Sequence, residues 1–119
     1  MSRSAVRNRT TKETRIELSI ELDGSGSTSV TTGLPFYDHM LDQLGRHGGF
    51  DLRIAADGDL HIDSHHTVED VAIALGEAFR EALGDKAGVR RFASGLYPLD
   101  EALVEVALDL SGQIGRAHV

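Results

Sequence analysis

Hydrophobic and polar residues alternate in an early segment whose apolar positions are Ile16, Leu18, Ile20 and Leu22. A period of two is typical of a β-strand with one buried face, and residues 23–26, Asp-Gly-Ser-Gly, follow as a turn. Residues 28–32 are rich in β-branched side chains, so we expect them to pair with the first strand as a hairpin. Alternation at 50–54 and at 60–62 predicts two further short strands.

Two other segments repeat their apolar residues at helical spacing. The first is short, ends at Gly48-Gly49, and has its apolar residues at Phe36, Met40, Leu41 and Leu44. The second begins after the N-cap candidates Asp63-Ser64, stops before Gly84, and carries one stripe formed by Val68, Val71, Ala72, Leu75, Phe79 and Ala82. These patterns predict an α+β fold, an antiparallel sheet with two helices packed on one face.

A strand pattern returns near the end of the chain. Residues 104–112 repeat the residue classes of 16–24 at an offset of 88, with three of the nine positions identical. Either the chain contains an internal duplication or two amphipathic strands merely resemble each other. We expect one domain over residues 1–119, divided into a flexible leader (1–8), a first repeat unit (9–88), the opening strands of a second (89–112) and a divergent tail (113–119).

Composition restricts the class of protein and the kind of metal site. Hydrophobic residues make up 40% of the chain, yet no apolar run is long enough to cross a bilayer, so we expect no membrane contact. The basic start lacks the apolar stretch of a secretory signal, which makes a cytoplasmic location the default. Because there is no cysteine, a metal ion would be held by histidine and carboxylate ligands.

The net charge of −7 is unevenly distributed along the chain. Residues 1–15 carry five Lys/Arg against one Glu, so the remainder is more acidic than the whole. An acidic body argues against nucleic acid as the main ligand. The basic start is either a disordered leader or a contact to a partner subunit.

The sharpest chemical motif opens the second helix: His65-His66-Thr67-Val68-Glu69-Asp70. Glu69 lies one helical turn from both histidines, so a histidine and a carboxylate can converge on one cation. Adjacent histidines point about 100° apart on a helix, which suggests two metal sites, or one site and a substrate contact. The alternative is a pair of exposed capping histidines beside solvated acids.

Other candidates are weaker when taken alone. His39, Gln43 and His47 recur every four residues on the first helix and form a polar stripe, which could equally be a solvated surface. His61 could line the same cleft or be structural. By themselves, Glu13 is an ordinary ion-pairing acid and Arg91 belongs to a surface arginine pair, although a guanidinium can bind phosphate.

Taken together, six motifs resemble the imidazoleglycerol-phosphate dehydratase family, in the family's order and spacing, from about residue 6 to Gly112. They are RTTKET (9–14), LPFYDHMLDQL (34–44), HGGFDL (47–52), HIDSHHTVED (61–70), GVRRF (88–92) and PLDEAL (98–103). The family fold is a duplicated α+β half. The resemblance therefore implies one full copy of the unit and the opening strands of a second.

The resemblance also implies a site. Two manganese ions (Mn2+) would be ligated by His39, His65, His66 and Glu69, and the matching residues of the second half would complete the site, partly across subunits of a homo-oligomeric cage of twenty-four copies. Glu13 would be the acid/base group. The residues implied in binding the phosphorylated imidazole substrate are Glu13, Gln43, His47 and, at the phosphate, Arg91.

The implied activity is that of a lyase in L-histidine biosynthesis, which dehydrates D-erythro-imidazole glycerol phosphate to imidazole acetol phosphate. The reaction would pass through an imidazolate and a diazafulvene-like intermediate, because the ring can act as the electron sink that a neighbouring carbonyl would otherwise supply. Glu13 would then transfer the proton.

The chain also departs from the family pattern. Gln113-Ile114 stands where the family has Arg-Pro, the second metal-binding helix is absent, and we assign no role to His118. We therefore expect a truncation or frame change near residue 112, or a genuine short relative, with the strand at 104–110 left as an edge prone to association. Two alternatives remain: a non-catalytic metal-binding or oligomerising domain, and a small non-haem iron or zinc hydrolase.

Overall fold

The computed structural model describes residues 3–111. The chain divides into two compact units, residues 1–85 and 86–119, where the sequence predicted one domain with a repeat boundary after residue 88. The division follows the end of the long helix, in a connecting segment where Gly84, Lys86 and Gly88 all have positive φ. That backbone conformation is compatible with a turn and not with a continuing helix or strand.

The first unit contains a four-stranded sheet in the order β1-β2-β4-β3. Its strands are β1 (Ser4–Thr10), β2 (Thr14–Glu21), β3 (Thr28–Thr31) and β4 (Asp51–Gly58). β2 pairs antiparallel with both β1 and β4, whereas β3 pairs parallel with β4. The predicted hairpin between the strand at 16–22 and residues 28–32 is therefore wrong. Both edges of β2 are already occupied, so β3 adds to the free edge of β4.

Residues 4–8 of the flexible leader predicted for 1–8 belong to β1, and residues 1–2 lie outside the described part of the chain. The basic side chains of β1 and of the preceding Arg3 pair with acids that are distant in sequence: Arg3 with Asp23 at 2.9 Å, Arg7 with Glu81 at 3.4 Å and Arg9 with Asp70 at 3.2 Å. The basic residues at the start of the chain thus form ion pairs with acidic residues of the same unit.

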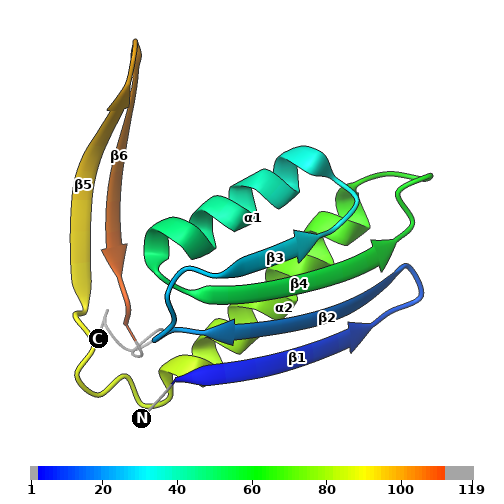
Figure 1. The fold of residues 1–119 in the computed structure, drawn as a ribbon, viewed down its shortest axis with the longest axis horizontal. Coiled ribbons are helices and arrows are strands. Elements are labelled where there is room, and N and C mark those ends of the chain that lie inside the picture. The colour runs from blue at the N-terminus through cyan, green and yellow to red at the C-terminus, as the bar shows by residue number, and fades with distance from the viewer. Residues whose placement is uncertain (1–2, 112–119) are drawn as a thin grey trace, which may run out of the picture. The chain divides into compact units, whose positions relative to one another are not determined.

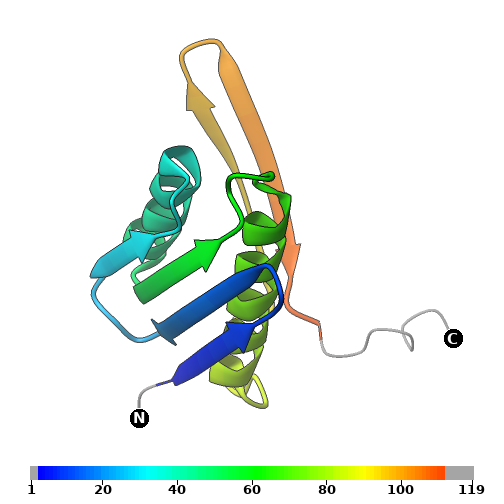
Figure 2. The ribbon, with the colours of Figure 1, turned by 90° about the vertical axis from the view of Figure 1, so that its right-hand side faces the viewer.

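Both helices pack on one face of the sheet, as predicted. α2 (His65–Leu83) lies along β1 and β2, and α1 (Pro35–Gly48) lies beside β3 and β4 (Figure 1, Figure 2). The main apolar core between the layers comprises Ile16, Leu18, Ile20, Leu52, Ile54, Val71, Ala74 and Ala78. Within the described residues, no helix is both long and apolar enough to span a membrane.

The buried faces of the helices differ from the predicted stripes. α1 buries Leu41 and Gly45, and the missing side chain of Gly45 lets the helix backbone approach the sheet closely. Phe36, by contrast, is 75% exposed. α2 buries mostly small residues and one acid: Thr67, Asp70, Val71, Ala74, Ala78, Ala82 and Leu83. The stripe is therefore rotated away from Val68, and Asp70 lies inside it.

Residues 59–63 form a turn instead of the short strand predicted at 60–62. β4 continues to Gly58, and the backbone N–H groups of Ile62 and Asp63 then bond to the carbonyl of Asp59 at 2.8 and 3.3 Å. These bonds reverse the chain into α2, so His61 lies in an exposed turn instead of on a sheet.

The second unit is a hairpin of β5 (Phe92–Leu99) and β6 (Ala102–Asp109), of which only the second strand was predicted. Its register repeats that of the first hairpin at the predicted offset: Ser4↔Glu21 corresponds to Phe92↔Asp109. The repeat therefore extends beyond residue classes to strand pairing, as expected for one full unit and the opening strands of a second. The predicted divergent tail, 113–119, lies outside the described residues.

The absence of a side chain at Gly58 allows β4 to lie close to the start of α2. A Cβ at this position would overlap the hydroxyl of Thr67 and lie 3.1 Å from Cγ2 of Thr14. We expect Gly58→Ala to lower the free energy of unfolding by about 1–3 kcal/mol in urea titrations. Gly76→Ala is the control, because a Cβ at Gly76 has open space in α2 and is expected to stabilise by about 0.5–1 kcal/mol. Equal effects of the two substitutions would contradict the overlap argument.

Candidate metal and active site

The first turn of α2 brings His65 and Glu69 together, as their spacing predicted. His65 Nε2 lies 3.2 Å from Glu69 Oε2, with the side chains 68% and 54% exposed. A hollow of about 560 Å³ opens beside them and is lined by Asp63, Ser64, His65, Val68 and Glu69. An imidazole nitrogen and a carboxylate oxygen thus face the same accessible space, the arrangement that a divalent cation needs from two of its ligands.

His66 has a different hydrogen-bond partner from its neighbour His65. Its Nδ1 lies 2.8 Å from Oδ2 of Asp59. This hydrogen bond is the main reason why the pKa of His66 lies above its ordinary value. The two imidazole rings meet edge to face, with centroids 5.5 Å apart.

The loop between β1 and β2 carries Glu13 to the same end of α2. The hydroxyl of Thr11 lies 3.2 Å from Glu13 Oε2 and 3.3 Å from Asp70 Oδ2, and it accepts the backbone N–H of Glu13 at 3.1 Å. After Asp59, the negative charge of Glu13 also raises the pKa of His66. The structure thus places the candidate acid/base glutamate in the electrostatic neighbourhood of a candidate metal ligand.

Asp70 is the anchor of that loop, a role that the sequence did not reveal. Its carboxylate is almost fully buried and accepts hydrogen bonds from Thr14 Oγ1 at 2.6 Å and Arg9 Nε at 3.2 Å. Burial alone would raise the pKa of Asp70, but these bonds, the charge of Arg9 and the Thr11 contact outweigh it and hold the pKa below its ordinary value. Helical spacing could have signalled it, because Asp70 lies three residues after Thr67 and four before Ala74 on the buried stripe.

α1 presents the remaining histidine candidates separately. His47 Nε2 lies 2.7 Å from Gln43 Oε1, which confirms that these two residues share a helix face, and His39 is exposed. The hydroxyl of Tyr37 donates to the carbonyl of Val68 at 3.2 Å and joins the start of α1 to the first turn of α2. Among residues 3–111, however, no three His, Cys, Asp or Glu side chains gather as a metal-binding group. The four predicted ligands thus do not form one group within these residues, although His65 and Glu69 meet.

Arg91, the predicted phosphate ligand, belongs to the second unit. Its guanidinium donates to Asp109 at 2.7 and 3.2 Å and lies 4.9 Å from the centroid of the Phe92 ring. The hydrogen bonds to Arg91 hold the pKa of Asp109 below its ordinary value. In this arrangement the arginine closes the hairpin, and a phosphate would have to compete with Asp109 for it.

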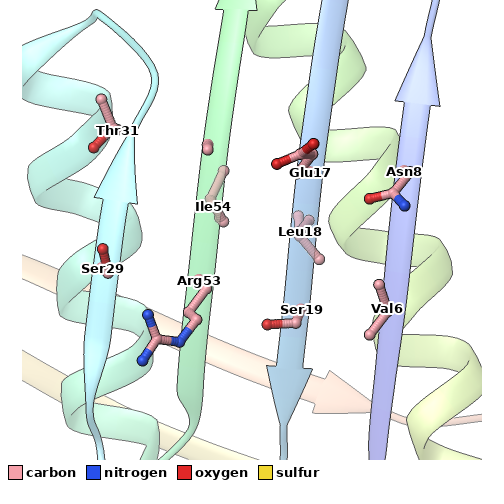
Figure 3. A pocket seen from close by; sticks show the side chains of 10 residues that line it. Val6, Asn8, Glu17, Leu18, Ser19, Ser29, Thr31, Arg53 and Ile54 are labelled. Carbon is pink, nitrogen blue, oxygen red and sulfur yellow. The ribbon is translucent and has the colours of Figure 1, made fainter.

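A separate hollow of about 400 Å³ lies on the sheet face opposite the helices (Figure 3). Arg53 of β4 stands there between Ser19 of β2 and Ser29 of β3, its direct neighbours in the strand register. These polar positions alternate with the buried core residues, so the hollow belongs to the outer, solvated face of an amphipathic sheet. It shares no lining residue with the hollow beside His65 and Glu69.

The sequence of the chain is similar to those of known proteins of one family. The family model for imidazoleglycerol-phosphate dehydratase matches residues 32–118, and so continues past Gly112, where we expected the resemblance to end. Imidazoleglycerol-phosphate dehydratase from Streptomyces coelicolor is 63% identical over 118 residues, which cover 99% of this chain and 60% of the relative. The enzyme of that name from a Parafrankia species is 60% identical over 119 residues, covering 100% of this chain and 61% of the relative.

A solved structure agrees with this match. The crystal structure of imidazoleglycerol-phosphate dehydratase from Staphylococcus aureus superposes with a TM-score of 0.79 at 33% identity, covering 92% of this chain and 59% of that one. The chain therefore spans about 60% of the length of the curated relatives that it matches. Since the family model covers most of the sequence and the fold agrees, the chain belongs to the imidazoleglycerol-phosphate dehydratase family.

Proposed function

We propose that this chain takes part in the dehydration of D-erythro-imidazole glycerol phosphate to imidazole acetol phosphate, a lyase step of L-histidine biosynthesis. The observation that carries the proposal is the first turn of α2, where His65 and Glu69 converge beside His66 in a member of this family. The hairpin loop that holds Glu13 meets the same turn through Asp70.

The donor set fits a divalent cation such as Mn2+, which accepts both imidazole and carboxylate ligands. His65 and Glu69 would hold one ion, and His66 a second, with His39 of α1 as a further ligand. Such ions would supply positive charge that makes loss of a proton from the imidazole ring of the substrate easier, so that the ring could act as the electron sink when the hydroxyl group leaves.

The chain's own residues then have distinct tasks. Glu13 would hold or release the proton that the reaction moves; the Thr11 hydroxyl, 3.2 Å from its Oε2, can orient the carboxylate. Gln43 and His47, paired on α1, would contact the substrate. Arg91 would bind the phosphate, which would replace Asp109 as the hydrogen-bond acceptor of its guanidinium.

The working site would be completed by other residues of the family's second half, in a cytoplasmic homo-oligomer. The reason is that the described residues supply ligand pairs and no group of three, so further ligands must come from elsewhere. The small hydrolase alternative requires a complete ligand set within this chain, and residues 3–111 give no support to it. The same observation is compatible with the non-catalytic alternative, which needs only the fold and a metal-binding surface.

The experiment is an assay of imidazole acetol phosphate formation with Mn2+ present. We expect little turnover from this chain alone, and turnover when a polypeptide supplying the C-terminal part of a full-length family member is added. His66→Ala in this chain should abolish the restored activity, while Asp57→Ala, an exposed acid on β4, should not. Failure to restore any activity would favour the non-catalytic domain, and full activity of the chain alone would contradict the need for further ligands.

A further inference from the structure

Asp59 is held in place from two directions. Its backbone carbonyl accepts the N–H groups of Ile62 and Asp63, which fix the turn between β4 and α2. Its side chain is only 16% exposed and reaches Nδ1 of His66 at 2.8 Å. Because the turn fixes the backbone of Asp59 and its side chain is largely buried, the carboxylate can impose an orientation on the imidazole of His66, which is 40% exposed.

The chemistry of this contact determines which nitrogen carries the hydrogen. An ionised carboxylate can only accept hydrogen bonds, so Nδ1 of a neutral His66 must be the protonated nitrogen. The lone pair is then on Nε2, at the far end of the ring. In contrast, His65 directs Nε2 itself at a carboxylate, that of Glu69, at 3.2 Å.

A second observation concerns the other oxygen of the same carboxylate. Oδ1 of Asp59 is buried without a hydrogen-bond partner among the described residues. A buried carboxylate oxygen without a partner is unfavourable, and a neighbouring positive charge offsets this cost. The imidazole of His66 can carry that charge when its Nε2 binds a proton or a cation, so the pair is better stabilised in the cation-bound state.

We propose that Asp59 is a positioning residue that fixes His66 in the Nδ1–H tautomer and thereby makes Nε2 its metal-binding nitrogen. The metal part of this inference rests on the proposed function, whereas the tautomer does not. It explains how adjacent histidines can serve different ions: His65 shares its Nε2 with Glu69, while His66 is turned by Asp59 to present Nε2 in another direction.

Long-range proton–nitrogen NMR correlations of the histidine rings test the tautomer directly. Spectra are recorded above the pH at which His66 loses its charge, a transition that the same spectra reveal. We expect the Nδ1–H pattern for His66 and its loss in Asp59→Ala, with His61 in its exposed turn as the internal reference. An Nε2–H pattern for His66 in the unmodified chain overturns the proposal.

Mn2+ binding to the same chain, measured by the electron paramagnetic resonance of free Mn2+, tests the consequence. Asp59→Ala is expected to weaken binding by about 10–100-fold, because the ligand loses its orientation and basicity. Asp59→Asn retains a carbonyl acceptor without the charge, so it should keep the Nδ1–H tautomer. Its Mn2+ affinity should lie between those of the unmodified chain and Asp59→Ala. Asp57→Ala removes a nearby exposed charge and should change neither readout.

The outcomes separate this proposal from the proposed function. If His66 shows the Nδ1–H pattern in the unmodified chain but Asp59→Ala leaves the Mn2+ affinity unchanged, Asp59 does not position His66 for metal binding. An unmodified chain that binds no Mn2+ removes the metal site of the proposed function and the metal part of this inference with it. In that case the tautomer spectra still decide whether Asp59 orients His66.

Discussion

Asp70→Ala is expected to lower the free energy of unfolding of the first unit by about 2–4 kcal/mol. The substitution removes the acceptor of the Thr14 hydroxyl at 2.6 Å and leaves Arg9, whose side chain is 33% exposed, without its ion-pair partner. Both donors lie between the sheet and α2, where water replaces the lost bonds incompletely. Urea titrations monitored by circular dichroism measure the change.

Glu81→Ala is the matched control for this substitution. Glu81 also joins α2 to an arginine of β1, Arg7, but the two side chains are 51% and 36% exposed and 3.4 Å apart. An exposed ion pair contributes less than about 1 kcal/mol, so Glu81→Ala should have a small effect. If the two alanine variants were equally stable, Asp70 would not be the anchor that its burial and hydrogen bonds indicate.

The same carboxylate predicts how stability depends on pH. The folded state holds the pKa of Asp70 below its ordinary value, so its contribution is complete above the pKa of the unfolded chain, about 3.9. The contribution is lost as the pH falls through that value toward the lower folded pKa. The difference in stability between the unmodified chain and Asp70→Asn should therefore be constant at neutral pH and shrink below about pH 4. A difference that persists unchanged at pH 3 would contradict this.

The strands show where local patterns suffice and where they fail. The alternation at Ile16 to Leu22 predicts β2, because one face is apolar and the other polar. β1 lacks that signal: the residues that face α2 include Arg7 and Arg9, which are neutralised by acids more than sixty positions away. From the local sequence alone, a basic strand that pairs with a distant acidic helix cannot be told from a disordered basic tail. The pairing of β3 with β4 fails for a related reason, since it depends on which strand edge the rest of the chain leaves free.

In the candidate site, too, some features follow from the local sequence and others depend on the fold. The convergence of His65 and Glu69 follows from helix geometry alone, and the structure confirms it. Asp59 and Asp70 were not singled out as site residues, because their roles depend on a turn and on a loop from another hairpin. Spacing within one helix is a local property, whereas orientation of a ligand by a distant carboxylate is a property of the fold.

Glu69→Gln is expected to weaken the binding of Mn2+ by about 100-fold, the largest effect expected of any single substitution at the proposed metal site. Near a protein surface, two unit charges 4 Å apart interact by about 4 kcal/mol, and the loss of about 2.7 kcal/mol corresponds to a factor of 100. The amide keeps the shape of the side chain and a carbonyl oxygen but removes the negative charge. Because Glu69 is 54% exposed, the substitution should leave the free energy of unfolding nearly unchanged.

Glu77→Gln is the control, since Glu77 is an exposed acid two helical turns further along α2 and the same charge is removed there. Isothermal titration with Mn2+ should show unchanged affinity for this variant and the 100-fold loss for Glu69→Gln. The double variant His65→Ala with Glu69→Gln should bind scarcely more weakly than either single variant, because two ligands of one ion act as a unit. Fully additive losses would mean that His65 and Glu69 contribute to different ions, and that their approach to 3.2 Å is only a surface ion pair.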